Sequence, residues 1–217
     1  MSCPLSGTLS PGGGRLELVG ISPQAYPREQ FTRSGMGGRF AAMLKFAGWD
    51  GIVIEGASDK PVWVDIRNGE VQLKEANHLW GLTTYETQQT IWREISSGKD
   101  YGKWMEPGGS ERNSGRTTQR SAVLSIGPAG ENRLRIASII HDAGNGFGAG
   151  GFGGVWGSKN LKAISVIGTG SVPVADPKAL LETRQWLMKY DADLEKGEAR
   201  GVSKYRPDTI QLGGLPS

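Results

Sequence analysis

The most regular alternation of apolar and polar positions lies between residues 61 and 73, where every second residue is aliphatic on both sides of Asn68-Gly69. Alternation places successive side chains on opposite faces of a strand, and Asn-Gly favours a tight hairpin turn, so we predict two antiparallel strands here. A polar segment that ends at about Ser34 is interpreted as a loop. Shorter apolar runs predict further strands at residues 16–21, 51–55, 122–126, 134–140 and 163–167.

Helix signals occur at three places along the chain. Gly48 is a favourable stop for the first helix, and Thr83 or Thr84 is a suitable N-cap for the second. Asp176 followed by Pro177 is a clean start for the third, because proline fits the first turn of a helix. The predicted helices are Phe40–Ala47, Thr83–Ile95 and Asp176–Tyr190.

Two long segments set the expected domain organisation. Residues 98–120 are polar and rich in glycine, with five basic and three acidic residues, which indicates either disorder or a functional cover. Beyond Gly197 the sequence is loop-like and ends without a closing element. We therefore expect one domain over residues 1–175 and the truncated start of a helical domain over residues 176–217.

The chain contains an internal repeat with an offset of 112 residues. Residues 38–56 align without a gap on residues 150–168, and each copy has the order glycine loop, short helix, strand. Pro61-Val62 and Pro173-Val174 recur at the same offset. Two copies of one unit predict a pseudo-twofold arrangement in which two glycine loops face a shared site.

Composition and charge exclude several classes of protein. The 34 glycines alternate with aliphatic runs, which favours a folded chain with close backbone approaches. The net charge of +3 is scattered, so we expect no nucleic-acid partner. Cys3 is the single cysteine, no apolar run could span a bilayer, and the first residues do not form an export signal. We therefore expect a cytoplasmic protein without a membrane anchor.

Glycine loops that open onto helices expose backbone N–H groups and are potential phosphate seats. Alternatively, the glycines allow close packing of helix on sheet. Gly148, Gly150 and Gly153 match a dinucleotide-binding fingerprint, which keeps an NAD enzyme as a distant alternative, but the following helix is too short for a normal crossover. The sequence lacks a P-loop and the usual metal-ligand spacings, so its residues are not expected to ligate a metal through side chains.

Four segments resemble the first domain of aldehyde:ferredoxin oxidoreductases. They occur in the family's order and the resemblance covers roughly residues 4–175. It implies an α+β fold in which two β-sheets, related by a pseudo-twofold axis, form with helices a saddle under the cofactor. The family's first strands would be missing, which indicates a fragment. The segments are Lys45–Asp50 with the following IVIEG, His78–Gly81, Ile126–Asn132 and Gly157–Ala163.

The resemblance implies a bis-pyranopterin (molybdopterin) cofactor of tungsten or molybdenum, whose two phosphates are bridged by Mg²⁺. Backbone carbonyls of Gly35 and Gly146 would bind Mg²⁺. Asn145 and Ala149 stand where the family has arginine, so Arg33, Arg39 or residues 98–120 would have to neutralise the second phosphate. The implied cofactor contacts are Arg15, Met36, Gly37, Gly38, Asn145, Phe147, Gly148, Ala149, Gly150 and Gly151.

For the complete enzyme, the resemblance implies oxidation of an aldehyde to a carboxylic acid. Electrons would pass through a 4Fe-4S cluster to ferredoxin or an iron-sulfur electron-transfer subunit, and a homodimer is possible. The cluster cysteines and proposed catalytic residues belong to the domains that follow, so no catalytic residue is expected here and Cys3 is not a ligand. The alternatives are a related aromatic acyl-CoA reductase subunit and a non-catalytic cofactor-binding remnant.

Overall fold

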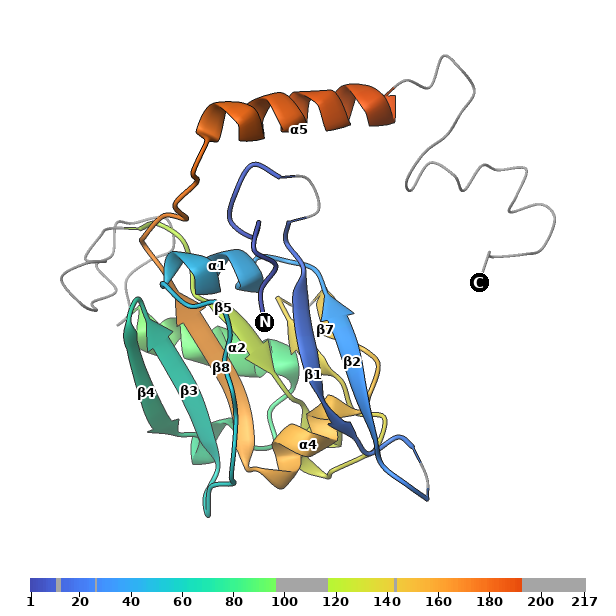
Figure 1. The fold of residues 1–217 in the computed structure, drawn as a ribbon. Coiled ribbons are helices and arrows are strands. Elements are labelled where there is room, and N and C mark those ends of the chain that lie inside the picture. Colours follow the sequence, from blue (N-terminus) through green and yellow to red (C-terminus); the bar gives the residue numbers. More distant parts are fainter. Residues whose placement is uncertain (11–12, 26, 97–116, 143, 193–217) are drawn as a thin grey trace. The chain divides into compact units, whose positions relative to one another are not determined.

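The computed structural model describes residues 1–10, 13–25, 27–96, 117–142 and 144–192. Figure 1 shows the elements in these ranges. Most of the predicted polar segment 98–120 lies outside the described residues. The strands are β1 Leu16–Ser22, β2 Gln30–Met36, β3 Val62–Arg67, β4 Glu70–Glu75, β5 Ala122–Ser125, β6 Ile139–His141, β7 Asn145–Phe147 and β8 Leu161–Ile167. The helices are α1 Phe40–Phe46, the 3-10 turn η1 Asn77–Leu79, α2 Thr84–Ile95, α3 Pro128–Glu131, α4 Phe152–Ser158 and α5 Pro177–Ala192.

Two sheets organise the larger part of the chain. One is six-stranded, with the order β4-β3-β8-β5-β6-β7, and the other pairs β1 with β2. Only the pair β3–β8 is parallel among the described strands, and β8 is buried along its whole length. The predicted α+β class with two sheets is confirmed.

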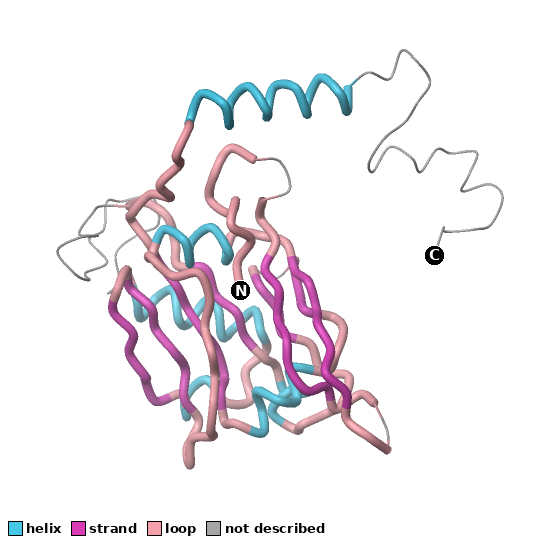
Figure 2. Tube along the Cα trace, viewed as in Figure 1, coloured by secondary structure: helices cyan, strands magenta, loops and turns pink. Residues whose placement is uncertain are grey.

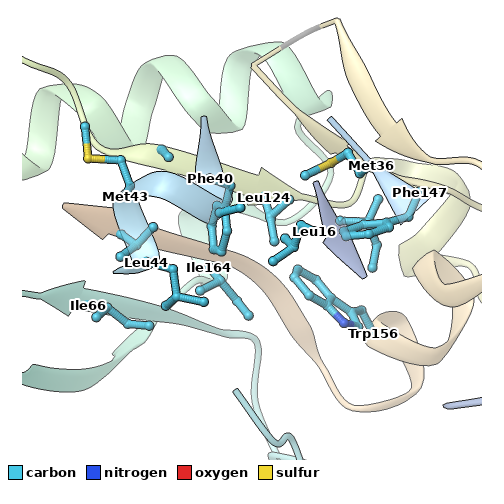
Figure 3. Packing of buried hydrophobic residues seen from close by; sticks show 14 of the residues in the cluster. Leu16, Met36, Phe40, Met43, Leu44, Ile66, Leu124, Phe147, Trp156 and Ile164 are labelled. Atoms are coloured by element: carbon cyan, nitrogen blue, oxygen red, sulfur yellow. The ribbon is translucent and has the colours of Figure 1, made fainter. Parts of the chain in front are cut away.

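The six-stranded sheet is covered on both faces. One face packs under α2, where Trp63, Leu79 and Ile91 belong to one apolar cluster. The other face packs against α1, α4 and the β1–β2 pair, so α1 and α2 lie on opposite sides of the sheet (Figure 2). In this larger cluster, Met36 and Phe147 point inward from the ends of β2 and β7 (Figure 3). Burial of this apolar surface supplies the main driving force for folding.

Several local predictions are confirmed. The hairpin turns at Asn68, whose φ of 51° is the left-handed conformation that Asn-Gly turns require. The side chain of Thr83 accepts from the Glu86 N–H in a capping box at the start of α2. Asp176 accepts from the Ala179 N–H at the start of α5.

Two local predictions were wrong and a third was right only in part. The predicted loop before Ser34 contains β2, whose inner face carries the small polar residues Thr32 and Ser34 and therefore lacks an apolar pattern. Residues 51–55 do not form a strand, because they pair with no strand among the described residues and instead line, with β1, an apolar groove of about 530 Å³. Of the predicted strand 134–140, only Ile139 and Ile140 form part of a strand, β6, which continues to His141, and Ile136 is 76% exposed.

The structure shows similar elements in the first half of each copy of the internal repeat. Helices α1 and α4 occupy equivalent positions at the offset of 112 residues, and Gly38 and Gly150 before them both have positive φ. In the second half, the copies differ because β8 is a central strand whereas residues 51–55 are unpaired. The repeat therefore predicts the loops and helices better than it predicts the sheets.

The chain divides between Pro173 and Val174, near the predicted boundary at 175. Helix α5 belongs to the second unit, together with Leu9, whose carbonyl accepts from Arg184. Among the described helices, none is both long enough and apolar enough to cross a membrane.

A buried ion pair ties the six-stranded sheet to the segments around α2 and α3. Lys162 is fully buried on β8, and its Nζ donates to the Leu82 carbonyl at 2.8 Å and to the Glu131 carboxylate. Glu131 also accepts from the Gly81 N–H at 2.9 Å. Burial lowers the pKa of Lys162, and the neighbouring Glu131 opposes that shift.

Removing the lysine charge is expected to destabilise this unit. Lys162→Met leaves a largely buried carboxylate without its cation, so we expect the free energy of unfolding in urea to fall by about 3 kcal/mol. Lys178→Met is the matched control, because the pair Lys178–Glu182 is exposed and loose at 3.9 Å, and it should leave stability unchanged. Equal stability of both variants would contradict a structural role for the Lys162 pair.

Candidate functional site

The close approach of β2 to β7 brings the two glycine loops together (Figure 1). A methyl group built on Gly38 would lie 3.0 Å from Asn145 Nδ2, and one built on Gly37 would lie 3.4 Å from Asn145 Oδ1. Asn145, at the start of β7, therefore lies beside the glycines that follow β2. The two glycine loops are neighbours, and the shared site that the repeat predicts stays a prediction.

Polar side chains of the β1–β2 pair hold the second loop in place. Ser34 Oγ accepts from the Ala149 N–H at 3.2 Å, and Ser22 Oγ donates to the Gly150 carbonyl at 2.9 Å. Gln24 Oε1 accepts from the Gly150 N–H at 3.0 Å. The sequence interpretation missed these residues, because they lie in the segment that it assigned to a polar loop. The alternation of Thr32, Ser34 and Met36 with exposed residues on β2 was the available signal.

The same local pattern occurs at the end of β2 and at the end of β7. Gly35-Met36-Gly37 and Gly146-Phe147-Gly148 each place one buried apolar side chain between two glycines. Because neighbouring residues of a strand face opposite sides, the buried side chain anchors the segment while the glycines leave their backbone accessible. The motif thus combines a fixed position with an open surface.

This pattern divides the predicted site residues into two groups. Met36 and Phe147 are 1% and 2% exposed, so only their backbone atoms are available to a ligand. Gly150 and Gly151 are also buried, and a methyl group on Gly151 would lie 1.9 Å from the Arg135 carbonyl oxygen, so this glycine serves close packing. The accessible residues are Arg15, Gly35, Gly37, Gly38, Asn145, Gly146, Gly148 and Ala149.

Arg15 lies close to the first glycine loop, because the preceding residue, Gly14, packs against Gly38. A methyl group built on Gly14 would lie 3.2 Å from the Gly38 carbonyl oxygen, so the backbone before Arg15 runs along the glycine loop. Arg15 itself is exposed. A guanidinium at this position is well suited to a phosphate, because it can donate two parallel hydrogen bonds.

The loops, rather than the helix ends, offer free backbone donors. Within the described part of the chain, the N–H groups of Gly37, Gly38 and Gly148 donate to no other residue. By contrast, the Gly153 N–H in the first turn of α4 donates to the Ala137 carbonyl at 2.9 Å. The phosphate site expected at the N-terminus of α4 is therefore unavailable there, because a protein carbonyl already accepts from this N–H group. The N–H groups that can still bind a ligand belong to the glycine loops.

Arg39 was a candidate for phosphate neutralisation, but its guanidinium forms hydrogen bonds with other residues of the protein. Its Nε donates to Asp142 Oδ2 at 2.6 Å, and its other nitrogens donate to the carbonyls of Arg120 and Ser121. A guanidinium with these partners has little donor capacity left for a ligand. Arg33 is exposed on β2 and stays available.

His141, at the end of β6, is a buried residue of the site that the sequence interpretation missed. Its Nδ1 lies 2.9 Å from the Val123 carbonyl oxygen, and its Nε2 accepts from the Arg39 N–H at 3.2 Å. Burial lowers the pKa of His141, although nearby Asp142 opposes this shift. A lone histidine that ends an apolar run before the glycine cluster was the only sequence signal.

The site suits an anionic ligand better than a metal ion held by side chains. Among the described residues, no group of three or more His, Cys, Asp or Glu side chains could hold a metal ion. A methyl group on Gly148 would have nothing within 4 Å, so the space over this backbone is open to a ligand. Accessible backbone donors and one guanidinium suit an anion, whereas they do not suit direct side-chain ligation of a metal.

Comparison with known proteins identifies the family of the chain. The family described as aldehyde ferredoxin oxidoreductase, N-terminal domain, matches residues 1–168. Because the match covers most of the chain, the protein belongs to the aldehyde ferredoxin oxidoreductase family.

The similar proteins are longer than this chain. A tungsten-containing aldehyde ferredoxin oxidoreductase of Thermococcus kodakarensis is 39% identical over 98% of the chain, and its counterpart in Pyrococcus furiosus is 38% identical over the same share. The chain spans 29% of the length of each. The active-site complex of benzoyl coenzyme A reductase with 1,5-dienoyl-CoA is a structural neighbour, with a TM-score of 0.75 and 31% identity over 94% of the chain and 27% of that protein chain.

The lowered pKa of His141 predicts a pH dependence of stability. The unfolded chain binds a proton below its ordinary pKa of about 6.5, whereas the folded chain resists protonation, so stability should decrease as the pH falls below 6.5. The expected slope is at most about 1.4 kcal/mol per pH unit for one group. Urea unfolding between pH 8 and pH 5 measures it.

Two histidine variants provide the controls for this slope. His141→Asn should flatten it, whereas His78→Gln should keep it, because His78 is an exposed residue that pairs with Glu94 on the surface. An unchanged slope in His141→Asn would show that another group causes the acid sensitivity.

Proposed function

We propose that this chain is the pterin-cofactor-binding domain of an oxidoreductase that oxidises aldehydes to carboxylic acids. The observation that carries the proposal is the pair of accessible glycine segments, Gly35–Gly38 and Gly146–Ala149, which meet through Asn145. Membership of the family and the names of the similar proteins support the same reading. A site with two adjacent glycine segments that can bind anions suits a cofactor with two phosphates.

The residues of the chain would hold such a cofactor mainly through the backbone. The N–H groups of Gly37 and Gly38 would serve one phosphate together with Arg15, and the Gly148 N–H would serve the other. The carbonyls of Gly35 and Gly146 would bind the bridging Mg²⁺, which prefers oxygen ligands. Since Asn145 and Ala149 add no positive charge, neutralisation at the second segment would fall to the magnesium ion and to Arg33, which is exposed on β2.

The cofactor supplies the redox chemistry, and the domain supplies position and electrostatics. In the overall reaction, an aldehyde gains one oxygen from water and releases two electrons and two protons. These electrons would pass through a 4Fe-4S cluster, whose ligands lie outside this chain, to ferredoxin or to an iron-sulfur subunit in the cytoplasm. The similar proteins named as tungsten-containing support tungsten over molybdenum.

A second candidate is the active-site subunit of an aromatic acyl-CoA reductase. It is favoured by the structural neighbour, which is a benzoyl coenzyme A reductase complex at 31% identity. Both candidates need the same cofactor-binding surface, so this domain alone does not distinguish them. Assays of the complete protein with an aldehyde and with an aromatic acyl-CoA thioester separate the two, and inactivity in both with bound pterin would indicate a non-catalytic binding module.

Two substitutions test the cofactor site directly. Arg15→Ala removes a phosphate donor, and Gly148→Leu fills the open space above the second segment, so each should lower the pterin and tungsten content per polypeptide about tenfold. Pterin fluorescence after oxidation and elemental analysis measure the content. Both residues are exposed, so thermal unfolding of the cofactor-free protein should change little.

Arg93→Ala and Gln72→Leu are the matched controls, because both residues are exposed on α2 and β4 away from the glycine segments. Both should keep full pterin content. If Arg15→Ala and Gly148→Leu also keep full content, the cofactor is not bound at this surface and the proposal fails.

A further inference from the structure

His141 lies directly beneath the first glycine loop. A methyl group built on Gly38 would come within 2.6 Å of His141 Cδ2, so only glycine allows the loop to rest on the imidazole. The imidazole also meets the edge of the Phe40 ring, with the ring centroids 6.0 Å apart and the planes at 84°. The ring is fully buried, so its position and orientation are fixed by packing.

The partners of His141 define which of its nitrogens carries the proton. The Val123 carbonyl can only accept, so Nδ1 must donate to it across the 2.9 Å separation. Burial lowers the pKa of His141 and so favours the neutral imidazole, in which Nε2 has a lone pair. That lone pair accepts from the Arg39 N–H at 3.2 Å, which is the peptide group that follows Gly38. Asp142 Oδ2 also lies 3.2 Å from Nε2 and opposes this pKa shift, although it is paired with the Arg39 guanidinium.

His141 also belongs to the strand pair that leads into the second loop. It stands opposite Asn145 in the register of β6 and β7, and the Asn145 side chain lies beside both Gly37 and Gly38. The carboxylate of the adjacent Asp142 forms an ion pair with the Arg39 guanidinium, with Oδ2 2.6 Å from Nε. The backbone and the side chain of Arg39 are therefore both attached to the turn between β6 and β7.

We infer that His141 is a positioning residue that fixes the first glycine segment against the second, through the hydrogen bond from the Arg39 N–H to its Nε2. This inference rests on the proposed function, because the distance between the two segments matters only if one ligand spans both. Without the bond, Gly37 and Gly38 would lose the support that fixes the direction of their N–H groups. A ligand with two phosphates would then bind less tightly, although its own contacts are all present.

Three substitutions at this position separate the two hydrogen bonds of the imidazole. His141→Gln places an acceptor near the position of Nε2, so it can keep the Arg39 contact. His141→Asn is shorter and can replace only the bond to Val123, and His141→Leu replaces neither. His78→Gln is the control, since His78 is the other histidine of the chain and lies on the surface.

Hydrogen exchange of the Arg39 amide, resolved to single residues by mass spectrometry of the complete protein, gives the direct readout. The amide should be protected in the unsubstituted protein and in His141→Gln, and should exchange at least tenfold faster in His141→Asn and His141→Leu. This readout does not depend on any bound cofactor. Rapid exchange of this amide in the unsubstituted protein would overturn the inference even if every variant failed to fold.

Pterin content per folded polypeptide is the second readout. The inference predicts that His141→Asn and His141→Leu lose roughly tenfold in content, while His141→Gln and His78→Gln keep it. Equal loss in His141→Gln and His141→Asn would contradict the positioning role and indicate only a structural one. Failure of the proposed function looks different, because pterin would then be absent from the unsubstituted protein while the Arg39 amide stayed protected.

Discussion

The constraint on which the site depends is the need to hold exposed glycine backbone in one conformation. Glycine loses more conformational freedom on folding than any other residue, so an open glycine loop is ordered only if its neighbours anchor it. Met36 and Phe147 provide this anchor, because each is buried in the same apolar cluster and is flanked by glycines in sequence. The large core between the six-stranded sheet and the β1–β2 pair therefore sets the geometry of the surface above it.

The anchors alone leave the two segments independent, and polar contacts connect them. Ser34 and Gln24 accept from the backbone of the second loop, and His141 accepts from the backbone of the first. Among the described residues, these bonds use the N–H groups of Arg39, Ala149 and Gly150, whereas those of Gly37, Gly38 and Gly148 donate to no other residue and can serve a ligand. Some backbone N–H groups of the loops thus stabilise the fold, and the others can bind an anion.

Much of the fold could be predicted from the sequence, since the hairpin at Asn68 and the helix starts at Thr83 and Asp176 depend on local turn and capping chemistry. Strand β2 could not, because its inner face carries Thr32 and Ser34 and only pairing with β1 reveals it. The glycine clusters identified the site, but the sequence could not separate accessible Gly148 from buried Gly151, which packs on the distant Arg135 carbonyl. Arg39 and His141 were misjudged or missed for the same reason, as their partners lie about 80 to 100 residues away in sequence.

The position of the bound cofactor in crystals of the complete protein, located by anomalous scattering at the tungsten absorption edge, tests the proposed site most directly. We expect one cofactor phosphate within hydrogen-bond distance of Gly37 or Gly38 and Arg15, and the other beside Gly148. A cofactor whose phosphates contact neither glycine segment would show that these segments do not bind it.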